Sequence, residues 1–333
     1  MLDWVSDTRL RVGDTDYDLM GSEDGAFTRL RLLKTRPMIE GYLPIVDEFR
    51  GGNVVELGIY RGGSTALFAQ LLEPRRLVAL ELDPDRVAIL DGFVADHDLD
   101  DVVRLHYGVD QADAQRVAAT VDDELGGEPI DLVLDDASHL YCPTASSFEV
   151  LFPRLRPGGL YVIEDWRPHQ DYLALFVHAI ADRPSPVTEA LEADLAVTLA
   201  KGQEPARLFF EWCAREILDP TSAWHAPVDS WFRAICADSA SPASAVVAEG
   251  VRLQLDASAG RTEVTPSLTT LAAQLVLALA CGAAGFGELT VNRYWIAIRR
   301  GPAPIDARDF RLHRAARDHL GTLAEFVPLD AAR

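Results

Sequence analysis

Five side chains that can bind a metal ion or accept a proton occur in two short polar clusters of the sequence. They are Asp135, Asp136, His139, Glu164 and Asp165. Carboxylate oxygens are the ligands that hard divalent cations such as Mg²⁺ prefer, and so many carboxylates repel each other unless a positive charge joins them. An imidazole titrates near neutral pH and can accept a proton beside such a site. The residue types therefore indicate a divalent-cation site with a general base.

Two apolar runs and a helix between them are expected to position these side chains. Residues 130–134 and 160–163 read as short buried strands, and residues 145–155 have apolar side chains at helical spacing. In a strand–helix–strand unit with parallel strands, both strands end at the same edge of the sheet, where ligands bind in open α/β sheets. Each side chain alone could be an ordinary polar loop residue. Their convergence at one edge favours a functional site.

A glycine turn earlier in the chain predicts a second part of that site. A strand at residues 54–57 leads through Gly58 and Gly62 into a helix at 66–72. A strand, a glycine turn and a helix N-terminus together bind nucleotide-like ligands. The dinucleotide fingerprint would require glycine where this chain has Tyr60, so a nicotinamide-dependent dehydrogenase is disfavoured.

The next predicted strand, residues 77–82, carries an acidic side chain at its end. A carboxylate at this place accepts hydrogen bonds from the ribose hydroxyls of a nucleoside. Glu81 fits this position better than Asp83 does. Alternatively, Glu81 is only a solvated acidic side chain at the end of a strand. Its spacing after the glycine turn favours the ribose contact.

Four segments of the sequence, in this order, carry a family resemblance. They read VVELGIYRGGST, GVDQAD, DLVLDDASH and LRPGGLYVIEDW. The first resembles motif I of class I S-adenosylmethionine-dependent methyltransferases, and the set is similar to the macrocin and mycinamicin sugar O-methyltransferases and to the cephalosporin hydroxylase-like group. The resemblance covers residues 50–166 and the predicted strands near 289–300. It implies a Rossmann-like α/β fold with a seven-stranded sheet and Mg²⁺-dependent methylation of a sugar hydroxyl on an antibiotic-like natural product.

The resemblance also implies roles for individual residues. Asp136, Glu164 and Asp165 would bind Mg²⁺, with His139 as the general base and Asp136 beside it, and with His169 as the second-choice base. The predicted S-adenosylmethionine contacts are Glu56, Gly58, Tyr60, Gly62, Ser64, Glu81, Asp110, Gln111 and Asp135. Of these, Asp110 or Gln111 would contact the adenine, and Asp135 would touch the cofactor or orient its neighbours. Ala137 departs from the glycine that is frequent in the family.

Five segments are expected along the chain. They are an N-terminal arm and helices (1–49), the cofactor-binding core (50–170), an inserted and mainly helical cap over the active site (171–265), a helix and two antiparallel strands that complete the core (266–301), and a helical tail (302–333). Residues 1–25 read as a loose polar arm or a lid, and 26–49 as a helix interrupted at Pro37. Within the cap, 251–255 and 262–264 read as a small hairpin.

Composition limits the partners. The chain has 333 residues and a net charge of −21, which argues against nucleic acid or an anionic membrane and favours a small-molecule acceptor. Four widely spaced cysteines indicate reduced thiols, and the acidic N-terminus does not read as a signal peptide. We therefore expect a cytoplasmic protein. Relatives assemble through N-terminal helices, which predicts a homo-oligomer.

Two alternative functions remain open at this stage. The same metal site would hold the adjacent oxygens of a catechol or a polyketide hydroxyl, so the acceptor could differ. A non-catalytic partner that keeps the methyltransferase fold is the second alternative, and the cephalosporin group makes it worth considering. The complete acidic cluster and His139 favour an enzyme, because a binding module has no need of them.

Overall fold

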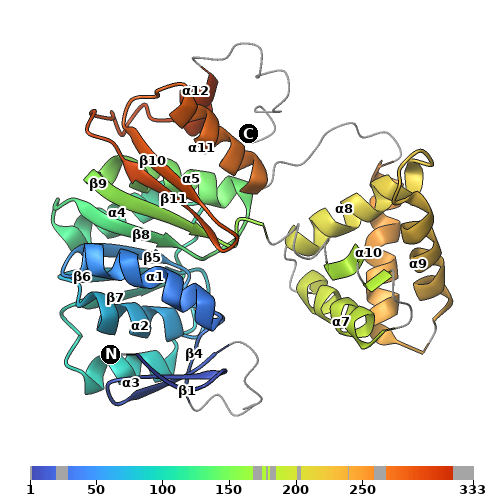
Figure 1. Cartoon of the computed structure of the whole chain (residues 1–333), viewed down its shortest axis with the longest axis horizontal. Coiled ribbons are helices and arrows are strands. Elements are labelled where there is room, and N and C mark those ends of the chain that lie inside the picture. Colours follow the sequence, from blue (N-terminus) through green and yellow to red (C-terminus); the bar gives the residue numbers. More distant parts are fainter. Residues whose placement is uncertain are drawn as a thin grey trace. The chain divides into compact units, whose positions relative to one another are not determined.

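The computed structural model describes residues 2–19, 29–167, 175–177, 179–180, 185–200, 204–238, 240–258 and 268–317. The chain divides into two compact units (Figure 1). The first contains Met1–Trp166 and Ser267–Ala332, and the second contains Arg167–Pro266. The candidate site lies in the first unit.

A seven-stranded sheet forms the centre of the first unit. In spatial order its strands are β10 (Phe286–Val291), β11 (Trp295–Arg300), β9 (Leu155–Glu164), β8 (Ile130–Asp135), β5 (Asn53–Leu57), β6 (Arg76–Glu81) and β7 (Val103–Tyr107). Strand β11 is antiparallel to both of its neighbours, and the other neighbouring pairs are parallel. The predicted seven-stranded sheet with its closing antiparallel pair is confirmed.

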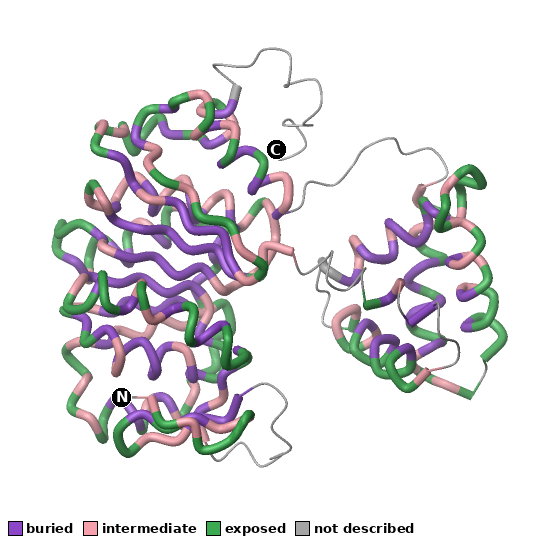
Figure 2. The backbone as a smooth tube through the Cα atoms, viewed as in Figure 1, coloured by how far each residue is buried: buried purple, intermediate pink, exposed green. Residues whose placement is uncertain are grey.

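Successive side chains of the strands point into two hydrophobic cores, one on each face of the sheet. In β8, Leu132 and Leu134 join one core and Val133 joins the other. The first face is covered by α1 (Arg36–Phe49), α2 (Gly63–Leu72) and α3 (Ala88–Asp96), and the second by α4 (Ala114–Leu125), α5 (Tyr141–Leu151) and α11 (Leu268–Ala280) (Figures 1 and 2). Because helices cover both faces, most side chains of the central strands are apolar, and buried polar residues such as Glu56 and Asp135 are exceptions.

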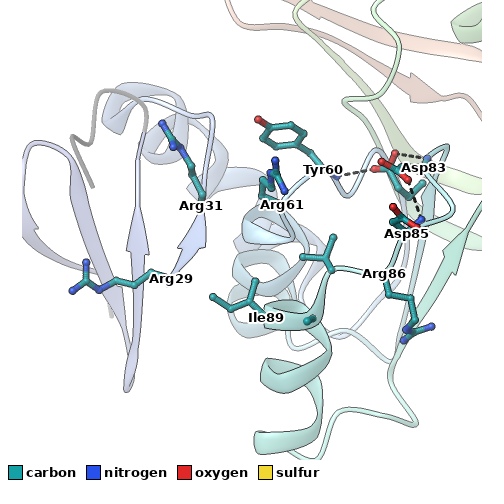
Figure 3. A pocket seen from close by; sticks show the side chains of 11 residues that line it. Arg29, Arg31, Tyr60, Arg61, Asp83, Asp85, Arg86 and Ile89 are labelled. Atoms are coloured by element: carbon teal, nitrogen blue, oxygen red, sulfur yellow. Dashed lines mark hydrogen bonds between the residues drawn. The ribbon is translucent and has the colours of Figure 1, made fainter. Parts of the chain in front are cut away.

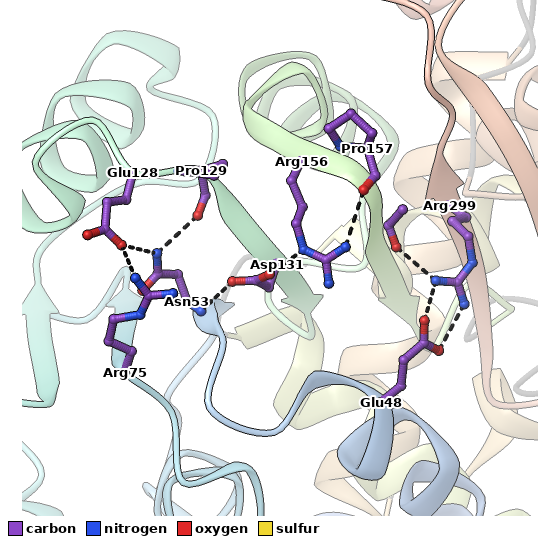
Figure 4. A network of polar contacts seen from close by, with 10 residues as sticks. Glu48, Asn53, Arg75, Glu128, Pro129, Asp131, Arg156, Pro157 and Arg299 are labelled. Carbon is purple, nitrogen blue, oxygen red and sulfur yellow. Dashed lines mark hydrogen bonds and ion pairs between the residues drawn. The ribbon is translucent and has the colours of Figure 1, made fainter.

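Polar contacts join the elements at the edge where the parallel strands begin (Figure 4). Asp131, near the start of β8, accepts a hydrogen bond from the backbone N of Asn53 at 2.7 Å and pairs with Arg156. Arg299 of β11 forms two hydrogen bonds with Glu48 of α1, at 2.6 and 3.0 Å. These contacts involve four strands, β5, β8, β9 and β11, and one helix, α1, at this edge. The opposite, carboxyl edge is the one that presents the candidate site.

The N-terminal residues form a second, four-stranded sheet rather than the predicted loose arm. Its strands are β1 (Leu2–Ser6), β2 (Arg9–Val12), β3 (Thr15–Asp18) and β4 (Leu30–Arg31). Alternate side chains of this sheet are buried in the same core as α1 and α2, and the hydroxyl of Tyr17 donates to Gln70 of α2 at 2.6 Å. The prediction was wrong because these strands are short and rich in charged residues, which obscures the alternation of their buried side chains.

The helix predicted for residues 26–49 begins only at Arg36. Pro37 stands in its first turn, where the missing backbone N–H costs nothing, so this proline starts the helix instead of interrupting it. Leu30 and Leu33 belong to β4 and to the loop after it. Phe27, another residue of the predicted apolar face, lies outside the described residues.

The second unit is helical. It contains α7 (Pro186–Ala200), α8 (Glu204–Leu218), α9 (His225–Ala237) and α10 (Pro242–Ser258) around a core with Phe209, Phe210 and Trp231. The predicted hairpin is wrong at 251–255, which lies inside α10, and its second half, 262–264, lies outside the described residues. The helical character of this segment agrees with the predicted insertion. Its position over the active site stays a prediction.

After β11 the chain forms one further short helix, α12 (Leu312–Arg317). The remainder of the predicted helical tail, 318–333, lies outside the described residues. Among the helices that the structure describes, none combines the length and the apolar character needed to cross a membrane.

The glycine turn after β5 brings two loops of the carboxyl edge into backbone contact. Gly58 has φ +94°, a conformation that residues with a Cβ rarely adopt. A Cβ at this position would lie 2.2 Å from the carbonyl oxygen of Asp136. The backbone N of Asp136 also donates to the carbonyl of Leu57 at 2.9 Å. Gly58 thus fixes the distance between the glycine loop and the loop that carries Asp136.

We expect Gly58→Ala to destabilise the protein more than Gly51→Ala does. Gly51 also has a positive φ, of +73°, but nothing lies within 4 Å of a Cβ there, so Gly51→Ala carries the backbone cost alone, about 1 kcal/mol. Gly58→Ala adds the collision with Asp136 and should cost about 3 kcal/mol or more. Urea unfolding followed by circular dichroism measures both. Equal losses in the two variants would show that the close approach does not constrain the loops.

Candidate active site

The carboxyl ends of β8 and β9 bring together three of the predicted metal and acid–base residues. Ligand atoms of Asp136, His139 and Asp165 all lie within 4.8 Å of one another. The Nε2 atom of His139 is 3.7 Å from Oδ1 of Asp136. Two carboxylates and an imidazole at this separation form a set of donors that fits one divalent cation.

Two of these residues have strained backbones. His139 has φ +55° and Asp165 has φ +46°, in the left-handed region that non-glycine residues rarely adopt. The backbone N of Asp165 is fixed by the carbonyl of Tyr294 at 2.9 Å, in the turn between β10 and β11. Such strain occurs at functional sites, where the surrounding structure holds a side chain in a required direction.

Glu164, the third predicted metal ligand, has other partners. It is 1% exposed, and its Oε2 accepts a hydrogen bond from Nζ of Lys34 at 2.5 Å. Its Oε1 accepts a hydrogen bond from the hydroxyl of Tyr42 at 2.6 Å. Lys34 also donates to Oδ2 of Asp136 at 2.8 Å. Lys34 therefore joins Glu164 to Asp136, and the role of Glu164 as a metal ligand stays a prediction.

Burial and charge act against each other in this group. Burial alone would lower the pKa of Lys34, but the carboxylates of Asp136 and Glu164 outweigh it and raise the pKa above its ordinary value. Burial and the charge of Asp136 raise the pKa of Glu164 above its ordinary value, and the paired ammonium of Lys34 opposes this rise. The ammonium group therefore stays charged at neutral pH.

Asp135 and Gln111, both predicted to contact the cofactor, lie in a buried network below the loop of His139. Asp135 accepts hydrogen bonds from Gln111 at 2.6 Å, from Tyr161 at 2.8 Å and from Ser147 at 3.1 Å. Gln111 in turn accepts a hydrogen bond from the hydroxyl of Ser138 at 2.8 Å. Burial raises the pKa of Asp135 to about 6. These contacts support the Ser138–His139 backbone, and contact of either residue with a cofactor stays a prediction.

Glu81 holds the glycine loop in place. Its Oε2 accepts hydrogen bonds from the backbone N atoms of Ile59, at 2.9 Å, and Tyr60, at 2.7 Å. Its Oε1 accepts a third from the backbone N of Asp83 at 3.0 Å. Tyr60 has φ +50°, so this loop too is held in a strained conformation. Glu81 is thus fixed at the end of β6, where the sequence predicts a ribose contact.

A pocket of about 350 Å³ opens beside this loop (Figure 3). Its lining includes Tyr60, Glu81 and Asp83 from the loops after β5 and β6, and Val87 and Ile89 at the start of α3. The remaining lining residues are four arginines together with Asp85 and Ala88; the arginines are Arg29, Arg31, Arg61 and Arg86. The predicted ribose carboxylate therefore borders an accessible cavity of the first unit.

The other predicted cofactor contacts surround the same loops. Asp110 is exposed, and its Oδ1 accepts a hydrogen bond from the backbone N of Ala112 at 2.8 Å. Gly62 and Ser64 lie at the start of α2, and Glu56 is buried in β5 below them. His169, the second-choice base, lies outside the described residues.

Lys34 and Tyr42 are the functional candidates that the sequence motifs did not reveal. Both precede the motif region, in the loop before α1 and in α1 itself. One signal was available: Lys34 is one of only two lysines in a chain whose basic residues are otherwise arginine. A lysine in that context indicates a requirement for an ammonium group.

A family model described as a methyltransferase domain matches residues 55–166. The chain therefore carries a methyltransferase domain. The matched residues run from β5 to Trp166, just beyond β9, and so include the glycine turn, Glu81 and the Asp136–His139–Asp165 cluster.

Parts of the chain are similar to known O-methyltransferases. The chain is 45% identical over 78 residues to 8-demethyl-8-alpha-L-rhamnosyl tetracenomycin-C 2'-O-methyltransferase of Streptomyces olivaceus, covering 18% of this chain and 20% of that protein. It is 60% identical over 37 residues to mycinamicin VI 2''-O-methyltransferase of Micromonospora griseorubida, covering 11% and 9%. The chain thus matches about a fifth or less of the length of these relatives. The solved structure of the MycE methyltransferase with Mg, SAH and mycinamycin VI aligns with 79% of this chain and 49% of that one, at 19% identity and a TM-score of 0.38.

Glu56 makes the stability of the methyltransferase domain depend on pH. It is 1% exposed, and Oε2 has no hydrogen-bond partner among the residues that the structure describes. Burial raises its pKa from 4.5 to about 7, against the opposing effect of the hydroxyls of Ser64 and Thr65. Above pH 4.5 the unfolded chain loses this proton while the folded chain keeps it. The contribution of Glu56 to stability therefore falls as the pH rises towards 7.

We expect Glu56→Gln to remove this dependence. Between pH 5.5 and 7 the wild type should lose about 2 kcal/mol of unfolding free energy relative to the variant, and little more above pH 7. Urea unfolding of both proteins at several pH values measures the difference. Asp135 and Glu164 contribute to the pH dependence of stability in both proteins. Their contributions therefore cancel in the difference between the two unfolding free energies. A constant difference across this range would contradict a raised pKa at Glu56.

Proposed function

We propose that the protein is an S-adenosylmethionine-dependent O-methyltransferase that acts on a sugar hydroxyl of a glycosylated natural product, with a divalent cation at the active site. The observation that carries this proposal is the convergence of Asp136, His139 and Asp165 at the sheet edge that also presents the glycine loop. A cofactor site and an acid–base site thereby share one edge of the methyltransferase domain.

The glycine loop supports the cofactor assignment. Gly58 brings the backbone close to the Asp136 loop without a Cβ, and Glu81 ends β6 beside a pocket large enough to admit a nucleoside. The unpartnered Oε2 of Glu56 is a buried acceptor below the same loop. These features fit a ligand that contains a ribose and a cationic group.

The chemistry that this site could perform is the transfer of a methyl group to oxygen. When bound, S-adenosylmethionine supplies an electrophilic methyl group, and a divalent cation held by Asp136 and Asp165 lowers the pKa of a hydroxyl group. His139 accepts the hydroxyl proton at a ring nitrogen, and the carboxylate of Asp136 stabilises the resulting imidazolium. The contribution of the chain is mainly the positioning of these groups, with acid–base help of about 10²–10⁴-fold.

The acceptor class follows from the relatives that the domain resembles. Their names describe O-methylation of sugars carried by tetracenomycin and mycinamicin. We propose the same class of acceptor here. A catechol or a polyketide hydroxyl would use the same metal chemistry, so both belong in the acceptor panel of the test.

Titration calorimetry with S-adenosylmethionine and with Mg²⁺ tests the proposal on the wild type, Asp136→Asn and His139→Ala. All three proteins should bind S-adenosylmethionine. Asp136→Asn should lose at least tenfold in Mg²⁺ affinity because it removes a ligand charge, whereas His139→Ala should keep it. Methyl transfer to a deoxysugar-bearing acceptor should fall about 10²–10⁴-fold in His139→Ala, since the base is missing.

Two results would contradict parts of this account. Failure of the wild type to bind S-adenosylmethionine would reject the proposed function altogether. A loss of Mg²⁺ affinity in His139→Ala equal to that in Asp136→Asn would make His139 a metal ligand and leave the reaction without the proposed base.

A further inference from the structure

A buried ammonium group lies at the candidate metal site. The side chain of Lys34 is 3% exposed, and its Nζ lies 2.5 Å from Oε2 of Glu164 and 2.8 Å from Oδ2 of Asp136. Lys34 reaches this position from the loop after β4. Burial of a single charge is strongly unfavourable unless it is paired, so these two contacts are required wherever Lys34 is buried.

Both carboxylate oxygens of Glu164 have a hydrogen-bond partner in this arrangement. Its second oxygen accepts the hydroxyl of Tyr42 at 2.6 Å, and the Tyr42 ring packs against Trp295 and Phe68 with centroid distances of 4.5 and 5.2 Å. Tyr42 is thereby held by core packing, and it holds Glu164 in turn. Both oxygens of Glu164 are engaged before a cation arrives.

Asp136 is divided between two partners. Its Oδ2 faces Lys34, and its Oδ1 faces His139, 3.7 Å away. Asp136 is therefore shared between the ammonium group and the cluster with His139 and Asp165. With all three carboxylates ionised, Asp136, Glu164 and Asp165 carry −3 and Lys34 carries +1, which leaves a formal −2 for a divalent cation to balance.

We propose that Lys34 is the internal counter-ion of this site: it keeps Glu164 out of the metal ligand set and thereby limits the affinity of the site for divalent cations. The inference rests on the proposed function only through the cation site at Asp136 and Asp165. In this arrangement Asp136 and Asp165 bind the cation. Glu164 holds the Lys34 ammonium in place, and this ammonium limits the affinity of the site for the cation. Repulsion between Lys34 and the bound cation would keep metal exchange easy.

Mn²⁺ binding, followed by the electron paramagnetic resonance signal of the free ion, tests the inference without any turnover. Lys34→Met removes the ammonium and keeps an unbranched side chain, so the Mn²⁺ affinity should rise at least tenfold. Glu164→Gln keeps the ammonium and removes its partner charge, so the affinity should fall at least tenfold. The double variant Lys34→Met/Glu164→Gln restores the formal charge of −2, and its affinity should lie within about threefold of the wild type.

The double variant is the decisive protein, because it removes the two buried charges of the Lys34–Glu164 pair together. If Glu164 is a metal ligand, the double variant will bind Mn²⁺ at least tenfold more weakly than the wild type, and the inference is overturned. Absence of Mn²⁺ binding from the wild type, the double variant and Lys34→Met would also overturn it. Calorimetric binding of S-adenosylmethionine by the same preparations would then show that the methyltransferase assignment survives this failure.

Discussion

The ammonium of Lys34 between Asp136 and Glu164 is the interaction on which the arrangement of the candidate site depends. Three carboxylates gather at the ends of two adjacent strands, and the apolar sheet beneath them offers no solvent to screen their repulsion. A buried positive charge with contacts of 2.5 and 2.8 Å makes this gathering possible. The Lys34 ammonium comes from a segment that is distant in sequence from Asp136 and Glu164. The N-terminal region is therefore part of the candidate site.

The N-terminal region reaches the site through a close backbone contact. Residue Arg31 forms a bridge with Gly62, and a Cβ at Gly63 would lie 2.1 Å from the carbonyl oxygen of Arg31. The small N-terminal sheet is further anchored to α2 by Tyr17 and Gln70. The glycines of the glycine loop therefore allow two close backbone contacts. Gly58 lies against the Asp136 loop, and Gly62 and Gly63 lie against β4, which precedes Lys34.

Sequence reasoning predicted the features that depend on local pattern. The parallel strands, the glycine turn and the convergence of Asp136, His139 and Asp165 follow from apolar runs that stop at polar clusters. The N-terminal sheet was missed because its strands are short and carry many charges on the exposed face. The pairing of Glu164 with Lys34 and Tyr42 was missed because it joins residues more than a hundred positions apart. The helix at 251–255 was missed because β-branched and apolar residues also occur in buried helices.

The most direct test of this account is a crystal structure with S-adenosylhomocysteine and Mn²⁺, with an anomalous difference map for the ion. We expect an Mn²⁺ peak bound by Asp136 and Asp165, the nucleoside at the edge that bears Glu81, and Lys34 still in contact with Glu164. An Mn²⁺ peak bound by Glu164 with Lys34 displaced would contradict the counter-ion role. A nucleoside bound away from the glycine loop would contradict the account of the whole site.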